Sequence, residues 1–137
     1  MVFLFDVNAN WTHAEDGDTG QQLEQIPEFN CSANLRYRYK NGRYGADLMT
    51  RYTGDIYERG LGSHGDVNYG NYFVMDTSAF VAFGRDKRHK LNLRLENLFD
   101  KDYANGYGRA KNTAGDYHVY KQYGLPRNVV LGYTYTF

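Results

Sequence analysis

The stretch that ends the chain, residues 127–137, restricts the fold because large apolar or aromatic side chains occupy every second position up to the final residue. These side chains are Val129, Leu131, Tyr133, Tyr135 and Phe137. A two-residue period rich in β-branched and aromatic residues predicts a β-strand with one apolar face. A soluble strand can show the same pattern, but a strand that ends on an aromatic residue is expected where a membrane strand reaches the lipid interface.

The same alternation recurs in five further stretches, and none of the chain shows the period of an amphipathic helix. The stretches are residues 3–13, 28–39, 44–54, 71–83 and 89–98. In residues 71–83 the period is blurred, because Phe80 and Val81 are both apolar. A β-bulge or a partly buried inner face would explain this pair. We therefore predict an all-β chain with six antiparallel strands in up-and-down order.

The connections between these stretches alternate in length. They cover residues 14–27, 40–43, 55–70, 84–88 and 99–126, in the order long, short, long, short, long. The short connection 40–43 contains Asn41-Gly42, a strong signal for a tight hairpin. Short turns at one end of a sheet and long loops at the other are typical of outer-membrane β-barrels.

Composition limits the class of protein further. A length of 137 residues predicts one domain, residues 1–137, and the 16 basic and 16 acidic side chains leave no positive excess for nucleic acid. The single cysteine excludes an internal disulfide.

Mean hydropathy is −0.72, and no window approaches the roughly 18 apolar residues of a membrane helix. Membrane barrel strands remain compatible, because half of their residues are polar. The apolar run at the start, residues 1–5, is too short for the hydrophobic region of a signal peptide.

The two faces of the predicted strands differ in charge. By parity one face is apolar, and the other, which would face the lumen of a barrel, carries Arg36, Arg38, Asp47, Arg51, Arg94 and Glu96. In a small soluble β-sandwich, such as a glycan-binding module, the apolar face would be a core instead. That alternative stays open at this point.

Three stretches resemble the C-terminal part of TonB-dependent outer-membrane receptors. Residues 91–103 contain a core that reads Asn-Leu-Phe-Asp-Lys-x-Tyr and ends at Tyr103; Gly124-x-Pro126-Arg127 leads into the last strand; and Ile26-Pro27 precedes a strand ending in Tyr-x-Tyr. The resemblance implies a transmembrane barrel of 22 strands that encloses an N-terminal plug. The strands of this chain would be the last six, with short turns in the periplasm and loops 14–27, 55–70 and 99–126 outside the cell.

The resemblance also implies a function and a set of partners. The parent would be an outer-membrane receptor of a Gram-negative bacterium for active uptake of a scarce nutrient, such as siderophore-bound iron or a similar metal chelate, a vitamin or an oligosaccharide. Its partners would be the lipid bilayer, the missing plug and remaining barrel strands, the TonB energy-coupling system and the barrel-assembly machinery. Six strands cannot close around a transport lumen. We therefore expect a piece of a receptor, without plug domain or signal peptide, that does not transport alone.

Residues in the last long loop are the predicted ligand contacts, because they combine aromatic rings with cations. They are Tyr103, Tyr107, Arg109, Lys111, Tyr117, Tyr120, Lys121 and Tyr123. Packing of these tyrosines on one another is the alternative. Gly132, Tyr135 and Phe137 resemble the signal read by the barrel-assembly machinery. No motif for covalent catalysis, metal binding or a cofactor stands out, so we expect a binding protein rather than an enzyme.

Overall fold

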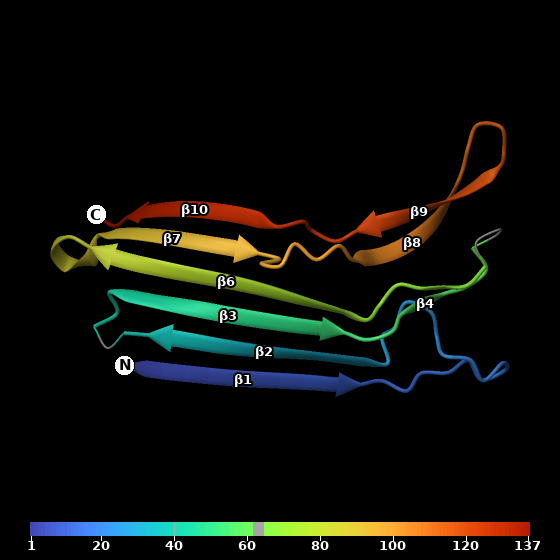
Figure 1. The fold of residues 1–137 in the computed structure, drawn as a ribbon, viewed down its shortest axis with the longest axis horizontal. Helices are drawn as coiled ribbons and strands as arrows, with labels where there is room; N and C mark the ends of the chain where they lie inside the picture. Colours follow the sequence, from blue (N-terminus) through green and yellow to red (C-terminus); the bar gives the residue numbers. More distant parts are fainter. Residues whose placement is uncertain (40, 62–64) are drawn as a thin grey trace.

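The computed structural model describes residues 1–39, 41–61 and 65–137. Antiparallel strands dominate it (Figure 1). In chain order the elements are β1 (Val2–Trp11), β2 (Phe29–Arg38), β3 (Tyr44–Thr53), β4 (Tyr57–Glu58), β5 (Val67–Asn68), β6 (Tyr72–Phe83), the 3₁₀ helix η2 (Arg85–Lys87), β7 (His89–Glu96), β8 (Ala104–Lys111), β9 (Tyr117–Tyr123) and β10 (Asn128–Tyr135).

A six-stranded sheet in the order β1-β2-β3-β6-β7-β10 forms the body of the molecule. All neighbouring strands are antiparallel, and the six predicted strands are confirmed with ends that differ by at most two residues. Both chain termini lie at one end of this sheet, together with the two short connections (Figure 1). We call this the short-turn end, and we call the opposite end, where the longer connections lie, the loop end.

The register of the sheet resolves the blurred pattern of β6. Pairing between β3 and β6 runs without interruption from Tyr44–Val81 to Thr53–Tyr72, so the β-bulge is wrong and the partly buried inner face is correct. Val81 lies on the apolar face, and Phe80 lies on the charged face beneath Arg38 and Lys90. Gly45 makes room for it, because a Cβ there would lie 2.7 Å from the Phe80 ring. The cations therefore cover an aromatic ring that the period alone places on an unexpected face.

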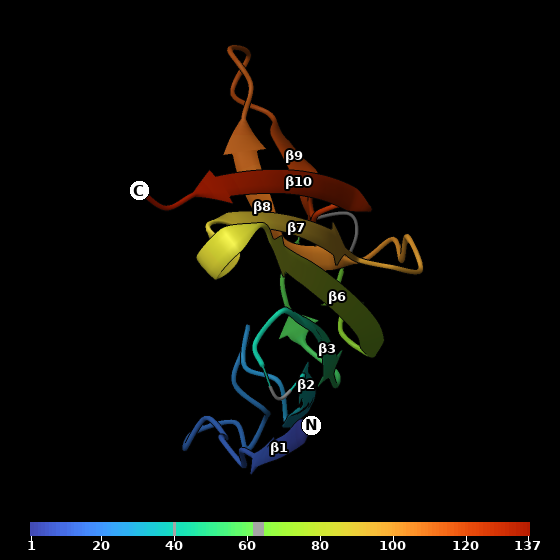
Figure 2. The same ribbon diagram turned by 90° about the vertical axis from the view of Figure 1, so that its left-hand side faces the viewer.

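The six-stranded sheet is a single curved layer (Figure 2). Its apolar face is continuous across all six strands and exposed, with Trp11 at 75% and Leu131 at 73%. Among the described residues no second sheet packs on this face, so the chain does not have the two layers of a β-sandwich. In the same residues, no helix has the length and apolar character needed to cross a membrane.

Two of the predicted loops contain strands. Residues 99–126 form the hairpin β8–β9, and residues 55–70 contain the short pair β4–β5. The sequence predicts these segments as loops, and its pattern does not reveal the strands within them. In β8, glycines at positions 106 and 108 interrupt the alternation that marks a strand. Lys40, in the first short turn, and residues 62–64, in the second loop, lie outside the described residues.

Candidate functional site

A small hydrophobic cluster at the loop end joins the two hairpins. Ile56, Tyr69 and Ala104 are its buried members, and Val67 and Tyr107 pack against it. The rings of Tyr69 and Tyr107 lie 5.5 Å apart. Because the cluster draws on β5, β8 and the segment before β4, it fixes the two hairpins against each other. The cluster gives the loop end a defined shape, which a binding site requires.

A hollow of 240 Å³ opens beside this cluster, between residues 68–72 and the start of the β8–β9 hairpin. Tyr69, Tyr72, Tyr103 and Tyr107 form its aromatic walls, and Lys101, Lys121 and Asp102 add charge. Burial raises the pKa of the Tyr69 phenol, so its hydroxyl stays neutral and can donate a hydrogen bond. Aromatic faces, hydroxyls and ammonium groups together suit an anionic or hydroxyl-rich ligand.

The structure brings only some of the predicted contact residues to this hollow. Tyr103, Tyr107 and Lys121 line it, and the ring of Tyr103 packs 4.5 Å from that of Tyr72. The other five lie along the hairpin: Arg109 donates to the Gly60 carbonyl at 2.7 Å, Lys111 lies over Tyr117, Tyr120 lies across Gly108, and Tyr123 lies under Lys121. Tyr103 and Tyr107 pack on Tyr72 and Tyr69, which lie outside the predicted set, and Tyr117 and Tyr123 pack under lysines of the hairpin.

Several lining residues escaped the sequence analysis. Tyr69 and Tyr72 belong to the run Asn-Tyr-Gly-Asn-Tyr at positions 68–72. The tyrosines of this run have the same aromatic and hydroxyl chemistry as those of the predicted loop. The repeated Asn-Tyr pair was a signal that could have identified them. Sequence order hid the relation, because two strands, β6 and β7, and the turn between them separate these residues from the hairpin. In the described residues, no group of three or more His, Cys, Asp or Glu side chains could hold a metal ion.

Asn97 holds the base of the β8–β9 hairpin in place. Its side chain is buried, with 2% of the residue exposed, and its amide donates to the carbonyls of Lys101 and Leu125, both at 2.9 Å. Its Oδ1 accepts from the Lys101 N–H at 2.8 Å, and its own N–H donates to Asp76 Oδ1 at 2.7 Å. One asparagine thus links β6, the entry to the hairpin and the segment that leads into β10.

A second link between the same segments is the ion pair of Asp100 and Arg127. The Arg127 backbone N–H donates to Asp100 Oδ1 at 2.9 Å, and its guanidinium donates to Oδ2 at 3.1 Å. These two hydrogen bonds, the backbone one first, hold the pKa of the Asp100 carboxyl below its usual range. Both residues belong to the motifs on which the family resemblance rests, and the structure gives those motifs a shared role in closing the loop.

Acidification should release this link at an unusually low pH. Because the folded pKa is depressed, the contact is fully formed above the ordinary aspartate pKa of 3.8 and is lost as the pH falls through the lower, folded value. We expect the Arg127 amide resonance in a pH titration by NMR to move with a midpoint below 3.8. Asp100→Asn should abolish that movement. A midpoint at or above the ordinary value would contradict the assignment.

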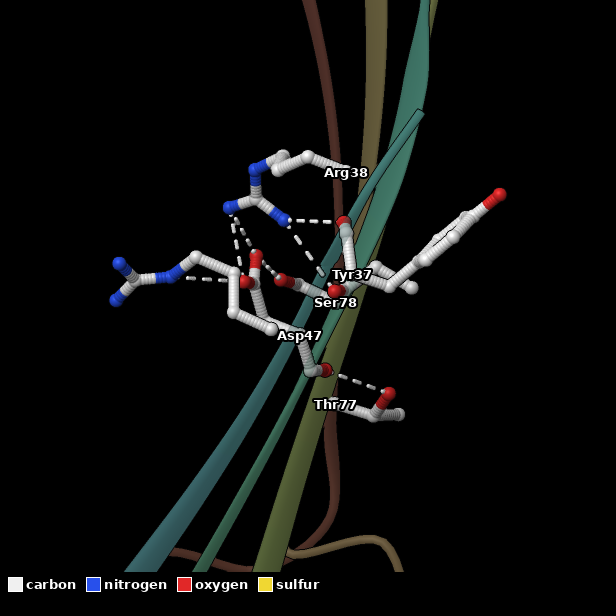
Figure 3. A network of polar contacts seen from close by, with 7 residues as sticks. Tyr37, Arg38, Asp47, Thr77 and Ser78 are labelled. Atoms are coloured by element: carbon white, nitrogen blue, oxygen red, sulfur yellow. Dashed lines mark hydrogen bonds and ion pairs between the residues drawn. The ribbon is translucent and has the colours of Figure 1, made fainter. Parts of the chain in front are cut away.

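On the charged face of the sheet, Asp47 is the centre of a polar network (Figure 3). Its carboxylate lies 2.8 Å from Arg38 Nη2 and 3.4 Å from Arg36 Nε, and it accepts a hydrogen bond from Ser78 at 3.3 Å. The backbone carbonyl of Asp47 also accepts from Thr77 at 3.1 Å. Arg36 and Asp47 face each other directly in the β2–β3 register, which explains why they meet.

All six residues predicted to face the lumen share this charged face. Arg36, Arg38, Asp47 and Arg94 line a hollow of 540 Å³ that crosses β2, β3, β6 and β7. Arg94 pairs with Glu96 at 2.7 Å, and Arg51 lines a neighbouring hollow of 470 Å³. Arg36, Arg38 and Arg94 therefore pair with carboxylates of this chain, and the hollows that the four arginines line remain open to further contacts.

The residues of the predicted assembly signal lie on or beside β10, which is an edge strand of the sheet. Gly132 lies on the charged face, opposite Asn92. Tyr135 and Phe137 lie near each other at the short-turn end, with ring centroids 5.1 Å apart, and Phe137 is fully exposed. Their rings are thus available to a partner at this edge.

Comparison with known proteins gives one kind of match. No protein-family model matches the sequence, and neither does any curated protein. Among solved structures, the chain is similar to P. aeruginosa FpvA bound to heterologous pyoverdines, in an FpvA–pyoverdine–iron complex. The TM-score is 0.71 at 18% sequence identity, and the match covers 96% of this chain but 17% of FpvA.

At this level of identity the match establishes the fold. It agrees with the single layer, the up-and-down order and the two contrasting faces that the register shows. The chain therefore has the fold of part of a β-barrel, with six antiparallel strands that form an incomplete barrel.

Proposed function

We propose that this chain is the C-terminal part of the β-barrel of an outer-membrane receptor that takes up a scarce nutrient. The observation that carries the proposal is the sheet itself: one layer, with a continuous exposed apolar face and a charged opposite face. An apolar face of this extent is stable in lipid and costly in water. The separation of short and long connections to opposite ends supports the same conclusion (Figure 1).

The likeness to FpvA supports a receptor that binds its ligand outside the cell. For this chain the ligand class is siderophore-bound iron or a similar chelate, a vitamin or an oligosaccharide. The hollow lined by Tyr69, Tyr72, Tyr103 and Tyr107 is where we place contact with it, because this hollow combines aromatic walls with two lysines at the loop end. Binding there needs no covalent chemistry, so the proposed role is that of a receptor and not of an enzyme.

The remaining partners follow from the two faces and the edge. The apolar face contacts the bilayer, and the charged face with the Asp47 network contacts a plug inside the completed barrel. Strands outside this chain complete the barrel at the edges β1 and β10, and the TonB system acts through the plug. Gly132, Tyr135 and Phe137 present the edge to the barrel-assembly machinery. Transport requires all of these parts, so the chain alone binds without transporting.

A pair of tryptophan variants tests the membrane orientation. Trp11 is the only tryptophan, so Trp11→Phe gives a silent background. In that background Val7→Trp places an indole on the apolar face, and the matched control Asn8→Trp places one on the charged face of the same strand. After refolding into lipid vesicles, lipids brominated in the acyl chain should quench the first indole strongly and the second weakly.

Two outcomes would contradict the proposal. Equal quenching at both positions would mean that the apolar face does not lie against lipid while the charged face points to the lumen. A chain that stays monomeric in water without detergent, unfolds cooperatively and shows no quenching by lipid would be a soluble binding module instead.

A further inference from the structure

The short-turn end carries a concentration of positive charge that the receptor function does not use. The described residues of its two connections include Arg43, Arg85, Lys87 and Arg88 against one carboxylate, Asp86. All five residues are exposed, and none of the four cations lies in an ion pair with another described residue. The loop 14–27 at the other end has four carboxylates and no lysine or arginine. The chain as a whole is neutral, but its charge is distributed unevenly along the strands: cations gather at the short-turn end, and loop 14–27 at the other end is acidic.

The two basic turns are held side by side. Lys87 Nζ donates a hydrogen bond to the backbone carbonyl of Asn41, and the Ala82 N–H donates to the carbonyl of Arg43. The Arg43 N–H in turn donates to Asn41 Oδ1 at 3.0 Å. These bonds join the turn before β3 to the turn after β6. The cations therefore form one patch with a defined position and not two independent flexible turns.

Aromatic side chains lie directly beside this patch on the apolar face. The His89 ring stacks 5.2 Å from Phe83 and lies 5.1 Å from Tyr135, and its Nδ1 lies 2.7 Å from the Tyr133 hydroxyl. The Thr136 N–H donates to the Arg88 carbonyl at 2.9 Å, which brings the end of β10 next to the basic turn. Aromatic rings with polar tips prefer the boundary between acyl chains and headgroups.

This neighbourhood sets the depth of the cations in a membrane. If the rings lie at the lipid boundary, the basic turns lie just outside it, at the level of the lipid phosphates. Arginine pairs well with phosphate because its planar donors match two oxygens at once. A patch that only kept the turns hydrated would not need to adjoin the aromatic rings, and a soluble polyanion would make no use of them.

We propose that the patch formed by Arg43, Arg85, Lys87 and Arg88, with the adjoining aromatic rings, binds the phosphate headgroups of anionic phospholipids in the leaflet at the short-turn end. The inference rests on the proposed membrane function and adds a lipid preference to it. Each cation near an anionic surface contributes enough to change affinity about fivefold. The site would enrich anionic lipid around one end of the sheet and fix the height of the barrel wall in the bilayer.

Lipid-selective quenching tests this site in the complete chain. Phe83→Trp in the Trp11→Phe background places a reporter beside the patch, and native Trp11 reports from the loop end. The chain is reconstituted in phosphatidylcholine vesicles that contain either brominated phosphatidylcholine or brominated phosphatidylglycerol at the same fraction. We expect phosphatidylglycerol to be favoured about fivefold or more at the Phe83 position and not at Trp11.

Charge variants identify the residues responsible. Arg85→Gln with Arg88→Gln should lower the preference at least severalfold, because two of the four cations are lost, and the fold should persist because only exposed side chains change. The matched control Arg59→Gln with Lys111→Gln removes the same charge at the loop end and should leave the preference intact. Equal quenching by the two lipids, or equal losses in both double variants, would overturn the lipid site while leaving the membrane function standing. Absence of quenching by either lipid would instead overturn the membrane function.

Discussion

Replacing Asn97 with alanine should lower the free energy of unfolding by about 2–4 kcal/mol, because three side-chain hydrogen bonds are lost at a buried position. The carbonyls of Lys101 and Leu125 and the N–H of Lys101 would be left without this partner. Urea unfolding of the chain refolded in lipid vesicles measures the loss. Hydrogen exchange at the Lys101 amide should accelerate as well, because that amide bonds to the Asn97 side chain.

Two controls separate the hydrogen bonds from other effects of the change. Asn112→Ala removes an asparagine that bonds within the exposed tip of the β8–β9 hairpin, and it should cost much less. Asn97 has a φ of 50°, a region that glycine adopts easily, so Asn97→Gly keeps the backbone and removes the bonds. If glycine restored the stability that alanine loses, the backbone angle and not the hydrogen bonds would be the cause.

Replacing Gly70 with alanine should lower the free energy of unfolding by about 1–3 kcal/mol, the usual cost of overpacking, and should disrupt the loop end. A Cβ at this position would lie 1.9 Å from the Gly54 carbonyl oxygen and 2.6 Å from the Ile56 nitrogen. Both contacts are with backbone, which cannot move aside as the end of a side chain can. The hydrogen bonds from the Tyr69 N–H to Ile56 and from the Asn71 N–H to Gly54 should open.

Hydrogen exchange at the Tyr69 and Asn71 amides measures this effect directly. Gly17→Ala is the matched control, because a Cβ at Gly17 would meet nothing within 4 Å. It should leave the same amides protected. Because Tyr69 and Tyr72 also line the loop-end hollow, the Gly70 variant should weaken ligand binding there as well. Unchanged exchange in the Gly70 variant would mean that residues 54–56 and 69–71 are not paired as the structure shows.

Prediction from sequence worked best where one residue period covers a whole strand. In residues 3–11 and 29–38 the alternation places the side chains on their faces, and the register of β1 and β2 confirms this. It worked less well where packing and not solvent decides the face, as at Phe80, which is sheltered by cations from β2 and β7. It failed for β8, where glycines take the place of the side chains that carry the period.

The candidate site shows the same division. Composition predicted ligand contacts along the whole aromatic and cationic loop, and only Tyr103, Tyr107 and Lys121 of that set line the hollow. The others lie along the hairpin because side chains alternate between the two faces of a strand, and each further residue lies farther from the base of the hairpin. The links that Asn97 makes to Leu125 and that Asp100 makes to Arg127 depend on backbone groups distant in sequence, which no local pattern encodes.

The sequence by itself determined the six strands, their two contrasting faces and the segregation of short and long connections. It could do so because strand period and turn chemistry are local, and each depends on a few neighbouring residues. Only the tertiary structure decided that the sheet is a single layer, that residues 68–72 join the hairpin around one hollow, and that Asp47 gathers two arginines. It also placed the basic turns beside the aromatic end of β10. These features depend on register and on contacts between segments distant in sequence, and these exist only after the chain has paired with itself.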